Sequence, residues 1–247
     1  MDAAQIIRQA VLSVERLRQE AEANNELSAA LHQVKLFQAR RFAATYADLM
    51  ASNDYAEATH FFLTELYSER NYAQRDTQFA RIAGALQRFF PAQVVATAVT
   101  MAKLHALTEA LDLEMARGWV AMEKDKPLDA ASFYVEAWRH VARSSDRYQQ
   151  LRDVLSVGQD LARLTRTNGL RFMLKMMRPA ANAAGLSALQ KFLESGFDTF
   201  SAMARHGDTA NAFLTIVKER ESEWLSVLFE AALPEAVSSV SFLVARN

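Results

Sequence analysis

Residues 92–122 read AQVVATAVTMAKLHALTEALDLEMARGWVAM, and the spacing of their apolar side chains decides the fold. Placed at 100° per residue, as in an α-helix, these side chains form two separate apolar faces. The first face holds Leu104, Leu107, Leu111, Met115 and Met122, and the second holds Val94, Ala98, Met101, Ala116, Trp119 and Val120. A helix that is apolar on two sides belongs in the middle of a bundle. The sequence therefore predicts a long central helix.

The composition extends this prediction to the whole chain of 247 residues. With Gly 7 and Pro 4, the chain has well under half of the usual share of these turn-forming residues, which is roughly 12%. Hydrophobic residues make up 51%, which is enough to bury a full core. We expect an all-α fold, a single multi-helix bundle of about nine or ten helices around the two-faced apolar helix.

The helical pattern covers residues 1–247 without an obvious linker, so we expect one domain with three parts. Residues 1–51 form an N-terminal helical hairpin that breaks at Asn24-Asn25, and it is either part of the bundle or an appendage to it. Residues 52–232 form the main bundle. Residues 233–247 form a tail whose β-branched and Ser content leaves its conformation open.

Charge and cysteine content exclude several kinds of function. The formal net charge of -1 argues against a nucleic-acid binder that works through bulk positive charge. The absence of Cys excludes disulfides, thiolate nucleophiles and Cys-based zinc or iron–sulfur sites. The N-terminal stretch does not follow the pattern of a secretory signal. The longest uncharged stretch, residues 89–102, is about 14 residues and too short to cross a bilayer. We expect a cytoplasmic protein.

A polar cluster interrupts the second apolar face of the central helix, because His105, Glu109 and Asp112 fall on it at i, i+4 and i+7. Burying an unpaired charge costs several kcal/mol, so such groups must be paired, protonated, metal-bound or open to a cavity. We favour a structural network in which Arg or Lys from a neighbouring helix supplies the counter-charge. A polar patch in a ligand pocket, a metal site and a solvated stripe are the alternatives.

Two further pairs of residues are weaker candidates. Glu221 lies beside an apolar line in the last long helix, with Arg220 next to it, and a buried or half-buried ion pair is the favoured interpretation. Glu57 and His60 have the Glu-x-x-His spacing of helical di-iron sites, but such a site needs a second pair and two more carboxylates. We therefore expect no metal and no cofactor.

A short basic segment lies beside a Met-rich one. Over residues 171–178, the basic residues Arg171, Lys175 and Arg178 alternate with Phe172 and the pair Met176-Met177. A basic amphipathic helix of this kind can lie on an anionic membrane surface. A core-facing helix with a charged outer edge is more common, so the sequence favours that interpretation over membrane association.

Residues 61–67 read FFLTELY and are followed by a polar loop and Arg75-Asp76. In this the chain resembles the proteobacterial protein family named for a FFLEELY motif, with Thr64 in place of the first Glu of the motif. The resemblance extends to LHALTEALD at 104–112, GLSALQKFLESGFDTF at 185–200 and FLTIVKERE at 213–221. It implies a bacterial, single-domain, helical protein, and the family carries no established function.

The sequence shows no nucleophile motif, no phosphate-binding glycine loop and no dinucleotide fingerprint. We therefore expect a non-enzymatic binding or scaffold protein, whose partner is another protein or an apolar small molecule. An enzyme that uses the His105, Glu109 and Asp112 cluster, with or without a metal, is the alternative, and a peripheral membrane protein is the second alternative. The narrow apolar stripe of the N-terminal hairpin must be covered by the bundle or by a second copy, which favours a homodimer.

Overall fold

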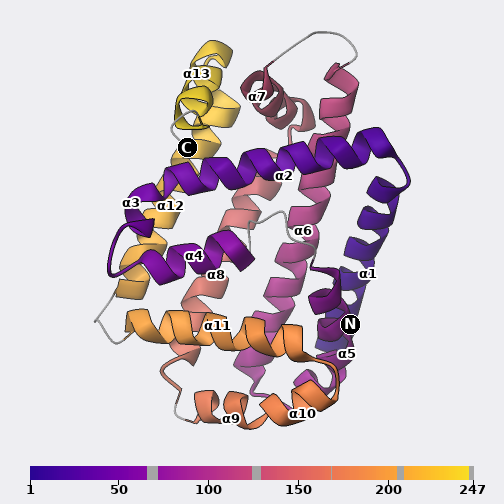
Figure 1. Ribbon diagram of the computed structural model, residues 1–247, viewed down its shortest axis with the longest axis vertical. Coiled ribbons are helices and arrows are strands. Elements are labelled where there is room, and N and C mark those ends of the chain that lie inside the picture. The colour runs from indigo at the N-terminus through magenta and orange to yellow at the C-terminus, as the bar shows by residue number, and fades with distance from the viewer. Residues whose placement is uncertain (66–71, 124–128, 168, 205–208, 245–247) are drawn as a thin grey trace.

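The computed structural model describes residues 1–65, 72–123, 129–167, 169–204 and 209–244 (Figure 1). These residues form helices α1 (Ala3–Glu22), α2 (Asn25–Thr45), α3 (Ala47–Met50), α4 (Ala56–Glu65), α5 (Ala73–Phe89), α6 (Ala92–Glu123), α7 (Ala130–Val141), α8 (Ser144–Leu164), α9 (Leu170–Met176), α10 (Arg178–Ala183), α11 (Ser187–Ala204), α12 (Thr209–Glu230) and α13 (Leu233–Val244). No strand occurs among them. The all-α prediction is confirmed, and the expected number of nine or ten helices is too low.

The long apolar helix is α6, which packs against α1, α2, α7 and α8. Its residues Leu111, Met115 and Ala116 are completely buried, as expected for a helix with two apolar faces. Within the described ranges, α6 is also the one helix that is long and apolar enough to cross a membrane by length and composition.

The first two helices lie against the rest of the bundle. α1 begins at a capping box formed by Asp2 and Gln5, and it packs on α5 and α6 through the buried side chains of Ile7, Val11 and Val14. α2 starts at an Asn24 cap and crosses the later half of α6 (Figure 1). The apolar stripe of α1 is therefore covered within one chain.

Several helix boundaries differ from the sequence expectations. The second half of the hairpin expected over residues 1–51 is not one continuous helix, because the chain breaks at Tyr46 between α2 and α3. The short helix after Gly169 ends at Met176, and α10 follows it directly. The tail, whose conformation was open, forms α13, with Ala236 and Val240 buried.

The short basic helix α9 differs in part from the core-facing helix with a charged outer edge that the sequence favoured, because large apolar side chains also lie on its outer side. None of its residues is buried, and the side chains of Phe172 and Met176 are 69% and 64% exposed.

Candidate functional site

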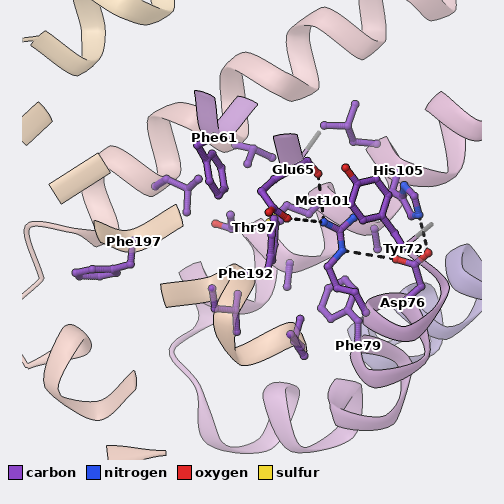
Figure 2. Close-up of a pocket in the computed structure, with 18 of the residues that line it drawn as sticks. Phe61, Glu65, Tyr72, Asp76, Phe79, Thr97, Met101, His105, Phe192 and Phe197 are labelled. Atoms are coloured by element: carbon purple, nitrogen blue, oxygen red, sulfur yellow. Dashed lines mark hydrogen bonds and ion pairs between the residues drawn. The ribbon is translucent and has the colours of Figure 1, made fainter. Parts of the chain in front are cut away.

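A cavity with a volume of about 230 Å³ lies between α5, α6, α8, α9 and α11, with α2 and α4 at its border. Its walls are mostly apolar, and Figure 2 shows how aromatic side chains such as Phe61, Phe79 and Phe192 surround it. The α6 residues on its wall run from Val94 to Asp112, which is about 27 Å at 1.5 Å per residue. The cavity is therefore elongated along α6.

Polar groups on the α6 wall concentrate toward its later half. The wall residues from Val94 to Leu104 are apolar, except for Thr97, whose hydroxyl donates to the Asp160 carboxylate at 3.0 Å. The later wall residues include His105, Thr108, Glu109 and Asp112. In Figure 1, α2 crosses this later half, whereas α9 lies at the end of the molecule where α6 begins. The cavity thus has an apolar end near α9 and a polar end near α2.

A cluster of polar side chains around Asp76 of α5 forms one part of the cavity wall. The Asp76 carboxylate accepts from Arg18 Nη2 at 2.6 Å and lies 2.9 Å from His105 Nε2, with Arg75 Nε at 3.9 Å. Burial by itself raises the pKa of Asp76, but the hydrogen bonds and charges of His105 and Arg18 outweigh it and hold the pKa below its ordinary value. Asp76 is therefore held as a carboxylate by helices α1 and α6.

Arg75 forms the neighbouring part of the wall. Its guanidinium lies 4.0 Å from the ring centroid of Tyr72 and 4.5 Å from that of Phe192, and it donates to the Glu65 carbonyl at 3.2 Å. The Glu65 carboxylate is 3.5 Å from Nη1 of the same guanidinium. Burial lowers the pKa of Arg75, against the opposing effect of the Asp76 charge. Figure 2 shows Glu65, Tyr72, Asp76 and His105 gathered on one side of the cavity.

The remaining candidates on α6 pair with other helices. Glu109 binds Lys35 of α2 at 2.8 Å. Asp112 accepts from Gln38 Nε2 at 2.9 Å and lies 3.9 Å from Arg147 of α8. Burial raises the pKa of Asp112, against the opposing charges of Arg147 and Lys35. His105, Glu109 and Asp112 thus share one cavity wall, and each also has a partner from a neighbouring helix.

The structure separates the other predicted candidates from this cavity. Glu221 accepts from Arg41 at 2.9 Å and from the Tyr46 hydroxyl at 2.9 Å, beside a small space of about 20 Å³. Arg220 does not pair with Glu221 but binds Asp48 at 2.6 Å. Neither residue lines the large cavity.

The weak metal candidates Glu57 and His60 are both exposed on α4. In the part of the chain that the structure describes, no group of three or more His, Cys, Asp or Glu side chains could hold a metal ion.

Sequence reasoning missed the partners of the cluster. Asp76, Lys35, Gln38 and Arg147 lie on three helices other than α6, and Glu109 is 74 residues from Lys35. A signal for one of them was present, since the pair Arg75-Asp76 follows the FFLTELY motif.

These features define a class of protein, a helical bundle around an elongated apolar cavity that has paired charges at one end. A family model for a domain of unknown function, DUF8198, matches residues 17–234, and the chain belongs to this family. No curated protein and no solved structure matches the chain at a significant level. The match does not test the resemblance to the FFLEELY-motif family, which stays a prediction.

Proposed function

We propose that this protein binds an apolar small molecule with one neutral polar group, and that the molecule occupies the cavity along α6. The observation that carries this proposal is the elongated, mostly apolar cavity of about 230 Å³. Ligand sites in helical bundles are concave and are lined by apolar side chains and a few polar groups. This cavity has each of these properties. A scaffold for a protein partner would not need such an internal space.

The volume sets the size of the ligand. A dry apolar cavity of about 150 Å³ accommodates benzene, with six carbons, so the same ratio gives about nine carbons for this cavity. Because the wall follows α6 from Val94 to Asp112, an extended chain fits better than a compact ring system.

The charged side chains on the cavity wall determine whether the polar group of the ligand is charged or neutral. Glu109 already pairs with Lys35, Asp76 with Arg18, and Glu65 with Arg75. A charged ligand group would add a charge without a partner, which costs several kcal/mol in a buried site. The Thr108 hydroxyl, which accepts from Gln150 at 2.8 Å, is still able to donate. A hydroxyl or carbonyl group on the ligand therefore suits the polar end.

Isothermal titration with n-alkanols from hexanol to dodecanol tests this proposal. We expect the affinity to rise about fourfold per methylene, the equivalent of about 0.8 kcal/mol. The increase should stop near nine carbons, and the carboxylic acid of the same length should bind more weakly. Absence of binding along the whole series, or an affinity that does not depend on chain length, would refute it.

A variant that fills the cavity supplies the control. Met101 lies on the cavity wall, whereas Met122 lies on the same helix and packs against a different part of the core. We expect Met101→Trp to abolish nonanol binding and Met122→Trp to preserve it. If both variants bind nonanol like the unaltered protein, the ligand does not occupy this cavity.

The enzyme alternative is favoured by one observation, the pairing of His105 with the buried Asp76 carboxylate on the cavity wall. A carboxylate that orients an imidazole is the arrangement used in general-base catalysis. Hydrolysis of a medium-chain p-nitrophenyl ester that is lost in His105→Gln would support this second candidate. Equal background rates in both proteins would eliminate this ester-hydrolase candidate.

A further inference from the structure

Between Asp160 and Glu194 the chain contains Arg and Lys residues but no Asp or Glu. The charged residues of this stretch are Arg163, Arg166, Arg171, Lys175, Arg178 and Lys191, in a protein whose formal net charge is -1. This stretch includes the whole of α9 and α10. The two helices therefore lie in a basic stretch of a chain whose other residues are acidic on balance.

The same segment exposes large apolar side chains. Phe172 is 69% exposed, Met176 is 64% exposed, and Met177 directly after α9 is 38% exposed. Phe172 and Met176 are four residues apart, so they share one face of the helix. Arg171 and Lys175 are also four residues apart and flank this face. Exposed apolar side chains between basic ones are characteristic of helices that lie in the interface of an anionic bilayer.

The opposite side of α9 faces the cavity, since Leu170, Met173 and Leu174 lie on the cavity wall. α9 therefore separates the apolar end of the cavity from the surface. A molecule that passed this helix would reach the apolar end first.

The attachment of this segment to the bundle is slight. Gly169 and Gly185, which bracket α9 and α10, have φ angles of 82° and 69°, a conformation that glycine adopts without strain. Between them, Ala181 is the one buried residue. The segment is held by contacts with α11, including the exposed ion pairs Arg171–Asp198 and Arg178–Glu194, both at 2.7 Å. Exposed pairs of this kind contribute little, about 0–1 kcal/mol each in water.

We propose that α9 and α10 form a docking surface for an anionic lipid bilayer. Phe172 and Met176 enter the boundary between headgroups and acyl chains, and the surrounding cations bind lipid phosphates. Glu194 and Asp198 offset part of the positive charge, and Lys175 and Lys191 are in excess. A protein partner is less favoured because the surface is small, with two short helices of 7 and 6 residues and basic side chains around the exposed apolar ones.

Docking in this orientation places the apolar end of the cavity against the hydrocarbon. α9 then serves as the entrance through which the ligand passes from the bilayer. The entrance role rests on the proposed binding function, whereas the docking surface does not.

Co-sedimentation with vesicles tests the docking surface. We expect the full-length protein to sediment with phosphatidylcholine vesicles that contain phosphatidylglycerol, and not with phosphatidylcholine alone. Binding should be lost at about 1 M salt, where the Debye length is about 3 Å. Lys175→Glu should weaken binding roughly 25-fold, because each unit of charge near an anionic surface corresponds to about fivefold. The double variant Phe172→Ser with Met176→Ser should weaken binding at least about tenfold.

Arg40→Glu is the matched control. Arg40 is exposed on α2, a helix that lies in the half of the molecule away from α9 in Figure 1. Its reversal removes the same charge from the protein as Lys175→Glu. We expect Arg40→Glu to bind vesicles like the unaltered protein. Failure to sediment with anionic vesicles, equal binding to neutral ones, or equal losses for Arg40→Glu and Lys175→Glu would each overturn the docking surface. Nonanol binding without vesicle binding would overturn this inference alone and leave the proposed function intact.

Discussion

The ion pair between Asp76 and Arg18 can be compared with a second Asp–Arg pair that has the same closest N–O distance. In both Asp76–Arg18 and Asp48–Arg220, a carboxylate oxygen lies 2.6 Å from Nη2 of the guanidinium. The Asp76 side chain is 5% exposed, and the Asp48 side chain is 61% exposed. Asp→Asn at each position therefore removes the same charge at two different depths.

The expected loss of stability in each variant depends on how deeply its ion pair is buried. Removing one partner of a buried pair leaves the other charge stranded, which costs about 3–5 kcal/mol, whereas an exposed pair contributes about 0–1 kcal/mol. For a chain of this size, 1 kcal/mol corresponds to a change in Tm of about 2–4 °C. We expect Asp76→Asn to lower Tm by about 6–20 °C and Asp48→Asn by less than about 4 °C. Thermal denaturation followed by circular dichroism at pH 7 measures both.

The pH dependence supplies a second test of the Asp76 pair. Since the folded pKa of Asp76 is below the ordinary value of 3.8, its contribution to stability is complete above that value and is lost as the pH falls through the folded pKa. The difference in Tm between Asp76→Asn and the unaltered protein should therefore shrink below about pH 4. Equal Tm shifts for the two Asn variants at pH 7, or a difference that persists unchanged in acid, would refute this reasoning.

Three further measurements test the remaining expectations. Asp112→Ala removes the carboxylate that balances the charge of Arg147 and accepts from Gln38, and it should cost about 3–5 kcal/mol. Glu114→Ala should cost less than about 1 kcal/mol, and equal small shifts in Tm would contradict this. Light scattering tests the homodimer that the sequence favoured. We now expect the monomer mass of 27.7 kDa, because α1 buries its apolar stripe within the chain, and a dimer mass would restore the earlier prediction. Elemental analysis should find no stoichiometric iron, zinc or manganese, and one full equivalent of metal would restore the metal-site hypothesis.

The fold class could be predicted because it depends on local sequence features, namely helical periodicity and composition. The two apolar faces of residues 92–122 and the scarcity of Gly and Pro were sufficient for an all-α bundle. The expected number of helices was too low because α3, α10 and α13 were not expected as separate helices. Tyr46 interrupts α2 without a Gly or Pro, and its hydroxyl bonds Glu221 of α12, a contact between residues 175 positions apart. Met177 separates α9 from α10, with Pro179 inside the next helix.

The candidate site could be predicted only along one helix. His105, Glu109 and Asp112 share a cavity wall because their spacing puts them on one strip of α6. The helices that supply Lys35, Asp76 and the other partners could not be inferred, because helical periodicity says which face is buried and not which helix covers it. The outward orientation of Phe172 was missed for the same reason, since either face of α9 could have been turned to the core.

A cavity of this size is itself an argument for a ligand. Unfilled core volume costs about 24 cal/mol per Å³, so about 230 Å³ corresponds to about 5 kcal/mol, a large share of the 5–15 kcal/mol that stabilises a typical protein. If the space exists for binding, filling it should stabilise the fold and abolish the function together. We expect Met101→Trp to raise Tm by about 1–8 °C, the equivalent of 0.5–2 kcal/mol, while nonanol no longer raises Tm further. Met122→Trp, at a residue that packs against the core and does not line this cavity, should leave Tm unchanged or lower it and retain the response to nonanol. A Met101→Trp variant that is destabilised and still responds to nonanol would show that the cavity is neither empty nor the binding site.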